Sequence, residues 1–125
     1  MSFNWGRQEE GLIEPSGNGC QGSILAVPNE LRGGTAVVFA NPNTTKRDRS
    51  NMRLAVSTDD AKTWSYGRVI YPGPAAYSDM AFADSGLVTL VYERGKEGPY
   101  EQISVDQMNL AWVMANEPTY RYNAK

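Results

Sequence analysis

The sequence contains no histidine and only one cysteine, Cys20. The absence of histidine excludes Ser-His and Cys-His nucleophile pairs within the 125 residues, and it excludes histidine-ligated metal sites. A single cysteine cannot form a disulfide within the chain. No apolar run approaches the roughly 20 residues that a membrane-spanning helix requires, so no membrane span is expected. Any chemistry of these residues must therefore use carboxylates, tyrosine, arginine or lysine.

Positive charge is also scarce, with 12 Lys and Arg against 14 Asp and Glu and a net charge of -2. Without a basic excess to neutralise a phosphate backbone, nucleic acid is not an expected partner. The hydrophobic fraction of 41% is typical of an ordered globular chain, and this length normally forms one domain. Residues 1–10 lack the charged stretch followed by an apolar stretch that defines a signal peptide.

The apolar runs are short and are separated by Gly, Pro, Asn and Asp, which is typical of β-strands joined by turns. We predict strands over 22–27, 35–40, 52–57, 67–71, 78–83, 87–92 and 103–108. Pro72 is expected to end the fourth strand, and Asp84-Ser85-Gly86 is expected to form a tight hairpin. No stretch has the sustained 3.6-residue period of a long helix. The segment 107–116 fits a short helix or a final strand, and we favour the strand.

Short, regularly spaced strands with turn signals indicate an all-β sandwich, barrel or propeller. Four strands followed by about three more match one blade of a β-propeller and most of a second. We therefore expect one blade over about 14–71, most of the next over about 72–113, and a tail over 114–125.

A local motif supports the propeller. Residues 57–64 read Ser-Thr-Asp-Asp-Ala-Lys-Thr-Trp and resemble the Asp box (BNR repeat) of sialidases and related propellers, Ser-x-Asp-x-Gly-x-Thr-Trp. The aspartate and hydroxyl groups of such a box hold a tight turn, so the motif marks fold and not chemistry. Ala61 replaces the usual glycine and would be strained if the position needs a positive φ. Residues 1–6 fit the end of a second box or simply a chain terminus with a tryptophan.

A longer series of motifs extends the resemblance to nearly the whole chain up to residue 112. In order, they are Glu14-Pro15, Cys20-Gln21-Gly22-Ser23-Ile24, Asn41-Pro42, residues 49–54, residues 76–80, residues 90–95, residues 100–103 and residues 109–112. Each piece is weak alone, but their order and spacing are specific. The chain resembles the C-terminal part of the sialidase (neuraminidase) family.

The resemblance implies a six-bladed β-propeller and the activity of an exo-alpha-sialidase, a glycoside hydrolase that removes terminal sialic acid with retention. Sialidases use a tyrosine nucleophile, because the carboxylate on the anomeric carbon of sialic acid would repel a carboxylate nucleophile. The implied substrates are sialylated glycoproteins, glycolipids or oligosaccharides. The resemblance implies no metal and no other cofactor. It places such proteins outside the cell, at the cell surface or in lysosomes.

Carried over to this sequence, Tyr77 matches the nucleophile, and Arg49 matches the third of three arginines that bind the substrate carboxylate. A planar guanidinium suits that role because it pairs with both carboxylate oxygens. Arg47 and Arg53 are the local alternatives. We expect Arg47 in a solvated loop and Arg53 facing outward or into a neighbouring blade. Glu93 matches the glutamate that holds the first arginine of that set.

The remaining polar and aromatic residues of the series are expected to have structural roles. We expect Cys20 and Gln21 to shape a loop near the site, with no catalytic thiolate because no histidine is present. Glu14 is not expected to be the catalytic base. The large aromatic side chains expected to pack in the core or between blades are Trp64, Tyr71, Tyr92 and Trp112.

The family also needs a base glutamate, an acid aspartate and two further arginines, which the resemblance places upstream of residue 1. The expected partner is therefore the set of missing N-terminal blades, and the isolated chain is expected to be inactive. Two other interpretations stay open. One is a non-catalytic carbohydrate-binding or structural Asp-box propeller, and the other is an unrelated β-sandwich.

Overall fold

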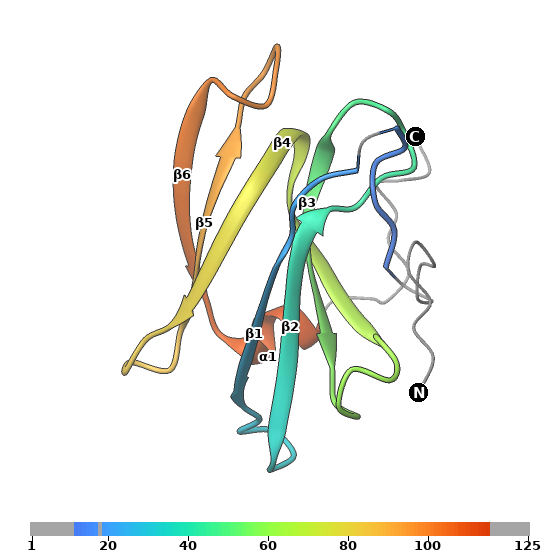
Figure 1. The fold of residues 1–125 in the computed structure, drawn as a ribbon. Helices are drawn as coiled ribbons and strands as arrows, with labels where there is room; N and C mark the ends of the chain where they lie inside the picture. The colour runs from blue at the N-terminus through green and yellow to red at the C-terminus, as the bar shows by residue number, and fades with distance from the viewer. Residues whose placement is uncertain (1–11, 18, 116–125) are drawn as a thin grey trace.

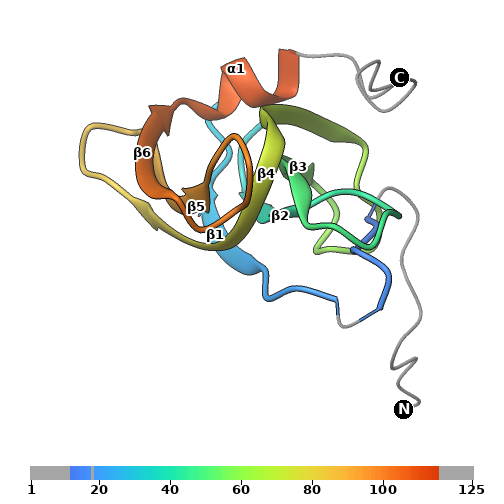
Figure 2. The same ribbon diagram turned by 90° about the horizontal axis from the view of Figure 1, so that it is seen from above.

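The computed structural model describes residues 12–17 and 19–115, which form six antiparallel strands and one short helix (Figure 1). The elements are β1 (Ser23–Pro28), β2 (Thr35–Pro42), β3 (Ser50–Ser57), β4 (Tyr66–Phe82), β5 (Val88–Arg94), β6 (Gln102–Met108) and α1 (Leu110–Ala115). The strands are hydrogen-bonded in sequence order. Seen from above, the sheet curls so that β1 lies close to β4 (Figure 2). The predicted all-β class is confirmed.

The core fills the inside of this curl. Its most buried side chains are apolar residues at alternate positions of the strands, as a sheet with one covered face requires. They include Val27, Val38, Leu54, Val56, Val88 and Leu90. Strand β3 is buried along almost its whole length, because β2 and β4 flank it while the curl covers its face. Among the described residues no helix is both long and apolar enough to cross a membrane.

The prediction that Pro72 ends a strand is wrong. Strand β4 runs without a break from Tyr66 to Phe82 and changes partner on the way. Its first part pairs with β3, and its second part pairs with β5. Pro72 and Pro74 lie where β4 changes partner and the register with β3 is irregular, so the missing proline N–H groups break no regular ladder there. A single strand thus joins two parts of the sheet that the sequence suggested were separate.

The prediction of a strand over 107–116 is also wrong beyond Met108. Residues 110–115 form α1, and the Asn109 side-chain oxygen accepts the Trp112 N–H at 2.7 Å, as an N-cap does. The helix buries Leu110, Val113 and Met114, mainly against β4. Arg68 of β4 lies over the Trp112 ring, with its guanidinium carbon 3.9 Å from the ring centroid. Tertiary packing thus selects the helix from two locally permitted structures.

The tight hairpin predicted at residues 84–86 is present. At the β4–β5 hairpin, Ala83 N donates to Leu87 O, and Gly86 adopts a φ of 87° that favours glycine. At the β1–β2 hairpin, Asn29 N donates to Gly34 O at 2.9 Å. Residues 1–6, for which a second box and a simple chain terminus stayed open, lie outside the described residues, as does most of the expected tail, residues 116–125.

Three of the four aromatic residues expected to pack are well covered. Trp64 is 9% exposed and meets Phe39 edge to face, and Tyr92 is 3% exposed. Burial and a hydrogen bond to Asp106 raise the Tyr92 pKa. The Tyr71 hydroxyl donates to Gly95 O. Trp112 is 42% exposed, and Arg68 lies over its ring.

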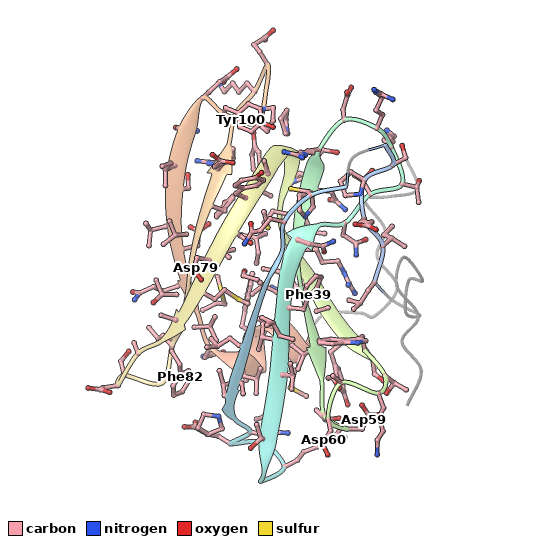
Figure 3. All side chains as sticks on the ribbon, in the orientation of Figure 1. Phe39, Asp59, Asp60, Asp79, Phe82 and Tyr100 are labelled. Carbon is pink, nitrogen blue, oxygen red and sulfur yellow. The ribbon has the colours of Figure 1, made fainter. Side chains whose placement is uncertain are left out.

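The Asp box closes the β3–β4 turn by side-chain hydrogen bonds. The Asp59 carboxylate accepts the Thr63 hydroxyl and the Thr63 N–H, while the Ser57 hydroxyl accepts the Ala61 N–H at 2.9 Å. These bonds stabilise the charged carboxylate and lower the Asp59 pKa to about 2, with the Thr63 hydroxyl contributing most. Asp59 and Asp60 lie at the lower end of the sheet, opposite Tyr100 (Figure 3).

We predict that Ala61→Gly stabilises the protein. Ala61 has a φ of 66°, which costs an L-residue with a Cβ about 1–2 kcal/mol and costs glycine little. Because glycine also makes the unfolded chain more flexible, the expected net gain in the free energy of unfolding is about 0.5–1 kcal/mol. Urea denaturation of the two proteins measures it. The matched control is Ala26→Gly at an exposed position of β1, which should lower stability. An equal loss at both positions would contradict the prediction.

Candidate active site

Tyr77 projects from the second part of β4 with its side chain 50% exposed. Its neighbours Ala75, Ala76 and Ser78 are buried, so the backbone that carries the phenol is firmly packed. The Tyr77 N–H donates to Glu93 Oε1 of β5 at 3.0 Å. Glu93 therefore lies beside Tyr77 and fixes its backbone.

Arg49 immediately precedes β3, where the backbone is irregular. Asn51 adopts a φ of 71°, a conformation that asparagine tolerates better than most residues, and the β3–β4 register shifts between Ser50 and Met52. Asn51 also closes the preceding loop, because its side-chain amide donates to Asn43 O at 2.7 Å and its carbonyl accepts the Asn43 N–H. The Arg49 carbonyl accepts the Ala75 N–H at 3.2 Å. Arg49 is thereby held next to the residues that precede Tyr77.

Three groups from different parts of the chain surround the Arg49 guanidinium. Its Nε–H donates to Gly19 O at 3.1 Å, and its Nη1 donates to the Tyr100 hydroxyl at 3.0 Å. Its central carbon lies 5.5 Å from the centroid of the Tyr77 ring, within the range of a cation–π contact. The structure thus brings Tyr77, Arg49 and Glu93 together at one end of the curled sheet.

The two alternative arginines lie elsewhere. Arg47 is exposed in the β2–β3 loop, as expected. Arg53 is 6% exposed and its guanidinium lies over Gly67 of β4, where a Cβ would collide with it. Arg53 is therefore not exposed to solvent, because the absent side chain of Gly67 leaves room for its guanidinium over β4. The other expectation, that Arg53 faces a neighbouring blade, stays a prediction.

Gln21 and Ser23 join the start of β1 to the strand that carries Tyr77. The Gln21 side-chain amide donates to Ser78 O at 2.9 Å, and its oxygen accepts the Ser78 N–H at 3.1 Å. The hydroxyls of Ser23 and Ser78 lie 2.9 Å apart and share a hydrogen bond. The Gln21 side chain thus binds both the N–H and the C=O of Ser78, as the backbone of a neighbouring strand would.

Cys20 is partly buried beside this site. Burial raises the pKa of its thiol, Arg49 acts in the opposite direction, and Glu93 and Glu14 add to the increase. The raised pKa favours the protonated thiol at neutral pH. The part of the chain that the structure describes brings together no three His, Cys, Asp or Glu side chains as a metal site would.

A hollow of about 540 Å³ lies beside the Arg49 guanidinium. Its walls come from the loop before β1, the β2–β3 loop with Arg47 and Asp48, and the β5–β6 loop with Glu97 and Tyr100. Both charge signs line it, so the hollow is polar without a strong net charge. It gives the guanidinium access to solvent at the upper end of the sheet, where Tyr100 is seen in Figure 3.

The sequence did not assign a role to two of the groups that contact Arg49. Tyr100 belongs to one of the quoted motifs, yet it is separated from Arg49 by 51 positions and nothing in their spacing relates them. Gly19 contributes only a backbone carbonyl, which no sequence pattern can mark. The one local feature that could have drawn attention to Tyr100 is its hydroxyl group directly after Gly98-Pro99, a pair typical of loops.

No family model matches the chain. Mouse Sialidase-4 is 30% identical over 119 residues, which cover 86% of this chain and 25% of the mouse protein. The sialidase of Micromonospora viridifaciens is 29% identical over 106 residues, which cover 82% of this chain and 15% of that protein. The chain therefore spans at most about a quarter of the length of these relatives.

The fold is similar to that of solved sialidases. A structure described as the Hadza microbial sialidase Hz136 superposes with a TM-score of 0.63 at 28% identity, covering 75% of this chain and 18% of the other. Together with the curled sheet, this likeness supports the predicted partial β-propeller of the sialidase type. The interpretation as an unrelated β-sandwich is thereby excluded.

We predict that Gln21→Ala destabilises the region around Tyr77. The change removes two partly buried hydrogen bonds to Ser78 and leaves both backbone groups without that partner, which should cost about 1–3 kcal/mol. Hydrogen exchange of the Ser78 amide should accelerate roughly tenfold or more. Gln107→Ala, which removes a single exposed bond to Thr89, is the control. Equal Ser78 exchange rates in the two variants would contradict the prediction.

Proposed function

We propose that the protein containing this chain is an exo-alpha-sialidase, with Tyr77 as nucleophile and Arg49 as a carboxylate ligand. The chain's similarity to sialidases in sequence and fold supports this proposal. The observation that carries the proposal is the contact between the Tyr77 ring and the Arg49 guanidinium at 5.5 Å. These two groups are 28 positions apart in the chain and are brought to one end of the sheet by backbone bonds.

The chemistry follows from the two groups. A sialic acid has a carboxylate on its anomeric carbon, so a guanidinium that binds that carboxylate also places the anomeric carbon near the adjacent phenol. The Tyr77 oxygen attacks the anomeric carbon, the glycosidic bond breaks, and water later releases the sugar with retained configuration. The attacking phenol must lose its proton to a base, and the leaving oxygen must gain one from an acid.

Glu93 is proposed to act beside the reacting groups. Its Oε1 is engaged by the Tyr77 N–H, which fixes the strand that presents the phenol. Its second oxygen is proposed to hold an arginine from another blade, so that two guanidinium groups are oriented around the same substrate carboxylate. This is a positioning role and does not require proton transfer.

The remaining groups of the site are proposed to come from further blades. Within the described residues, β1 and β6 are the edges of the sheet, and large apolar side chains lie exposed on them. Ile24 is 65% exposed, Ile103 71% and Val105 60%. Such a surface suits packing against neighbouring blades of the same propeller, which would also bring the base, the acid and two more arginines.

The first prediction from this proposal is that the 125-residue chain alone does not hydrolyse sialosides. One arginine and one phenol without a base supply neither deprotonation nor full carboxylate binding. The chain should also be poorly stable or self-associate, because its edge strands and apolar faces are exposed. A fluorogenic sialoside assay and light scattering measure these properties. Hydrolysis by the purified chain, after exclusion of contaminating sialidase, would contradict the prediction.

The second prediction concerns a completed propeller, in which this chain replaces the matching segment of mouse Sialidase-4. Hydrolysis of the fluorogenic sialoside should be present, and Tyr77→Phe should lower kcat by about 10²-fold or more while sialic acid still binds. The control is Tyr66→Phe, a tyrosine at the start of β4 whose ring lies near Arg32. Full turnover by the Tyr77→Phe variant would contradict the nucleophile assignment. Binding without turnover in the unaltered completed propeller would favour a non-catalytic carbohydrate-binding protein.

A further inference from the structure

The Arg49 guanidinium needs a support that its own chain segment does not provide. An arginine side chain has about 2 kcal/mol of rotational entropy, and Arg49 lies at the border of a loop and a strand. The Tyr77 ring offers one face, but a cation–π contact does not select the rotation of the guanidinium about its long axis. Directional hydrogen bonds are required to fix that rotation.

Two hydrogen bonds fix the rotation of the guanidinium, and their acceptors lie far apart in the sequence. The Nε–H is bound by Gly19 O at 3.1 Å, and Nη1 is bound by the Tyr100 hydroxyl at 3.0 Å. A guanidinium has five N–H groups, so these bonds use two and leave three, one on Nη1 and two on Nη2. The Nη1–Nη2 side can still offer two parallel N–H groups to a carboxylate.

The loop that presents Tyr100 is itself highly organised. The adjacent Glu101 carboxylate accepts the N–H groups of Lys96, Glu97 and Gly98 at 2.9, 2.9 and 3.0 Å. These bonds, with that of Lys96 the largest contribution, lower the Glu101 pKa, so the carboxylate is charged at neutral pH. Because the Glu101 carboxylate binds three N–H groups of its own loop, the β5–β6 loop does not depend on Arg49 to form.

Tyr100 contributes little to the core. Its side chain is 63% exposed and lines the hollow beside Arg49. A phenylalanine at this position would therefore pack almost as well as tyrosine, and the main difference would be the hydrogen bond to Arg49.

We propose that Tyr100 is a positioning residue whose hydroxyl orients the Arg49 guanidinium for a substrate carboxylate. The inference rests on the proposed function for the identity of that carboxylate, and on the observed hydrogen bond for the role of the hydroxyl. It assigns a function to the β5–β6 loop, which lies far from Arg49 in the sequence.

The test in the completed propeller is Tyr100→Phe, with Tyr66→Phe as the matched control. Inhibition by free N-acetylneuraminic acid should weaken about tenfold, as expected for one hydrogen bond to a charged group, while inhibition by its methyl ester stays unchanged. KM for the fluorogenic sialoside should rise more than kcat falls. A merely structural defect would affect acid and ester alike, and that outcome, or no change in either, would overturn the proposal.

A second measurement uses the completed propeller and does not depend on catalysis. Phenylglyoxal modifies accessible guanidinium groups, and mass spectrometry reports the rate at each arginine. Tyr100→Phe should increase the rate at Arg49 several-fold relative to Arg32, which serves as the internal reference. An unchanged ratio would overturn the positioning role. An increased ratio, combined with a completed propeller that neither binds nor hydrolyses sialosides, would retain the positioning role and reject the proposed function.

Discussion

The constraint on which the structure depends is the change of partner within β4. One continuous strand pairs with β3 through its first part and with β5 through its second part. Because the Arg49 carbonyl accepts the Ala75 N–H close to this change, the residue before β3 is tied to the strand that carries Tyr77. Without the uninterrupted strand, the guanidinium and the phenol would belong to separate parts of the sheet.

The site is built mainly from backbone contacts. The Tyr77 N–H meets Glu93, the Ser78 backbone meets Gln21, and the Arg49 Nε meets the Gly19 carbonyl. Backbone groups have fixed positions once the strands have formed, so they hold polar side chains with little further loss of entropy. Such preorganisation is what a site needs if it is to bind a charged substrate group in one orientation.

Fold-determining and site residues occupy opposite ends of the molecule. The Asp box, with Asp59 and Asp60, closes a turn at the lower end, whereas Tyr100 marks the upper end (Figure 3). The turn tolerates a left-handed alanine because several side-chain hydrogen bonds hold it. Its strain therefore affects stability at a place remote from the Tyr77–Arg49 pair.

The sequence by itself determined the all-β class, most strand positions and the hairpin turns, because alternating apolar residues and turn residues act locally. The sialidase resemblance came separately, from the order and spacing of short motifs. It also identified Tyr77, Arg49 and Glu93 as candidates through short motifs, whose roles are still proposals. Only the tertiary structure decided that β4 continues through Pro72, that 110–115 are helical, that Arg53 is buried, and that Tyr100 contacts Arg49. Each of these depends on which distant strand or loop is the neighbour, and local propensity carries no information about such partners.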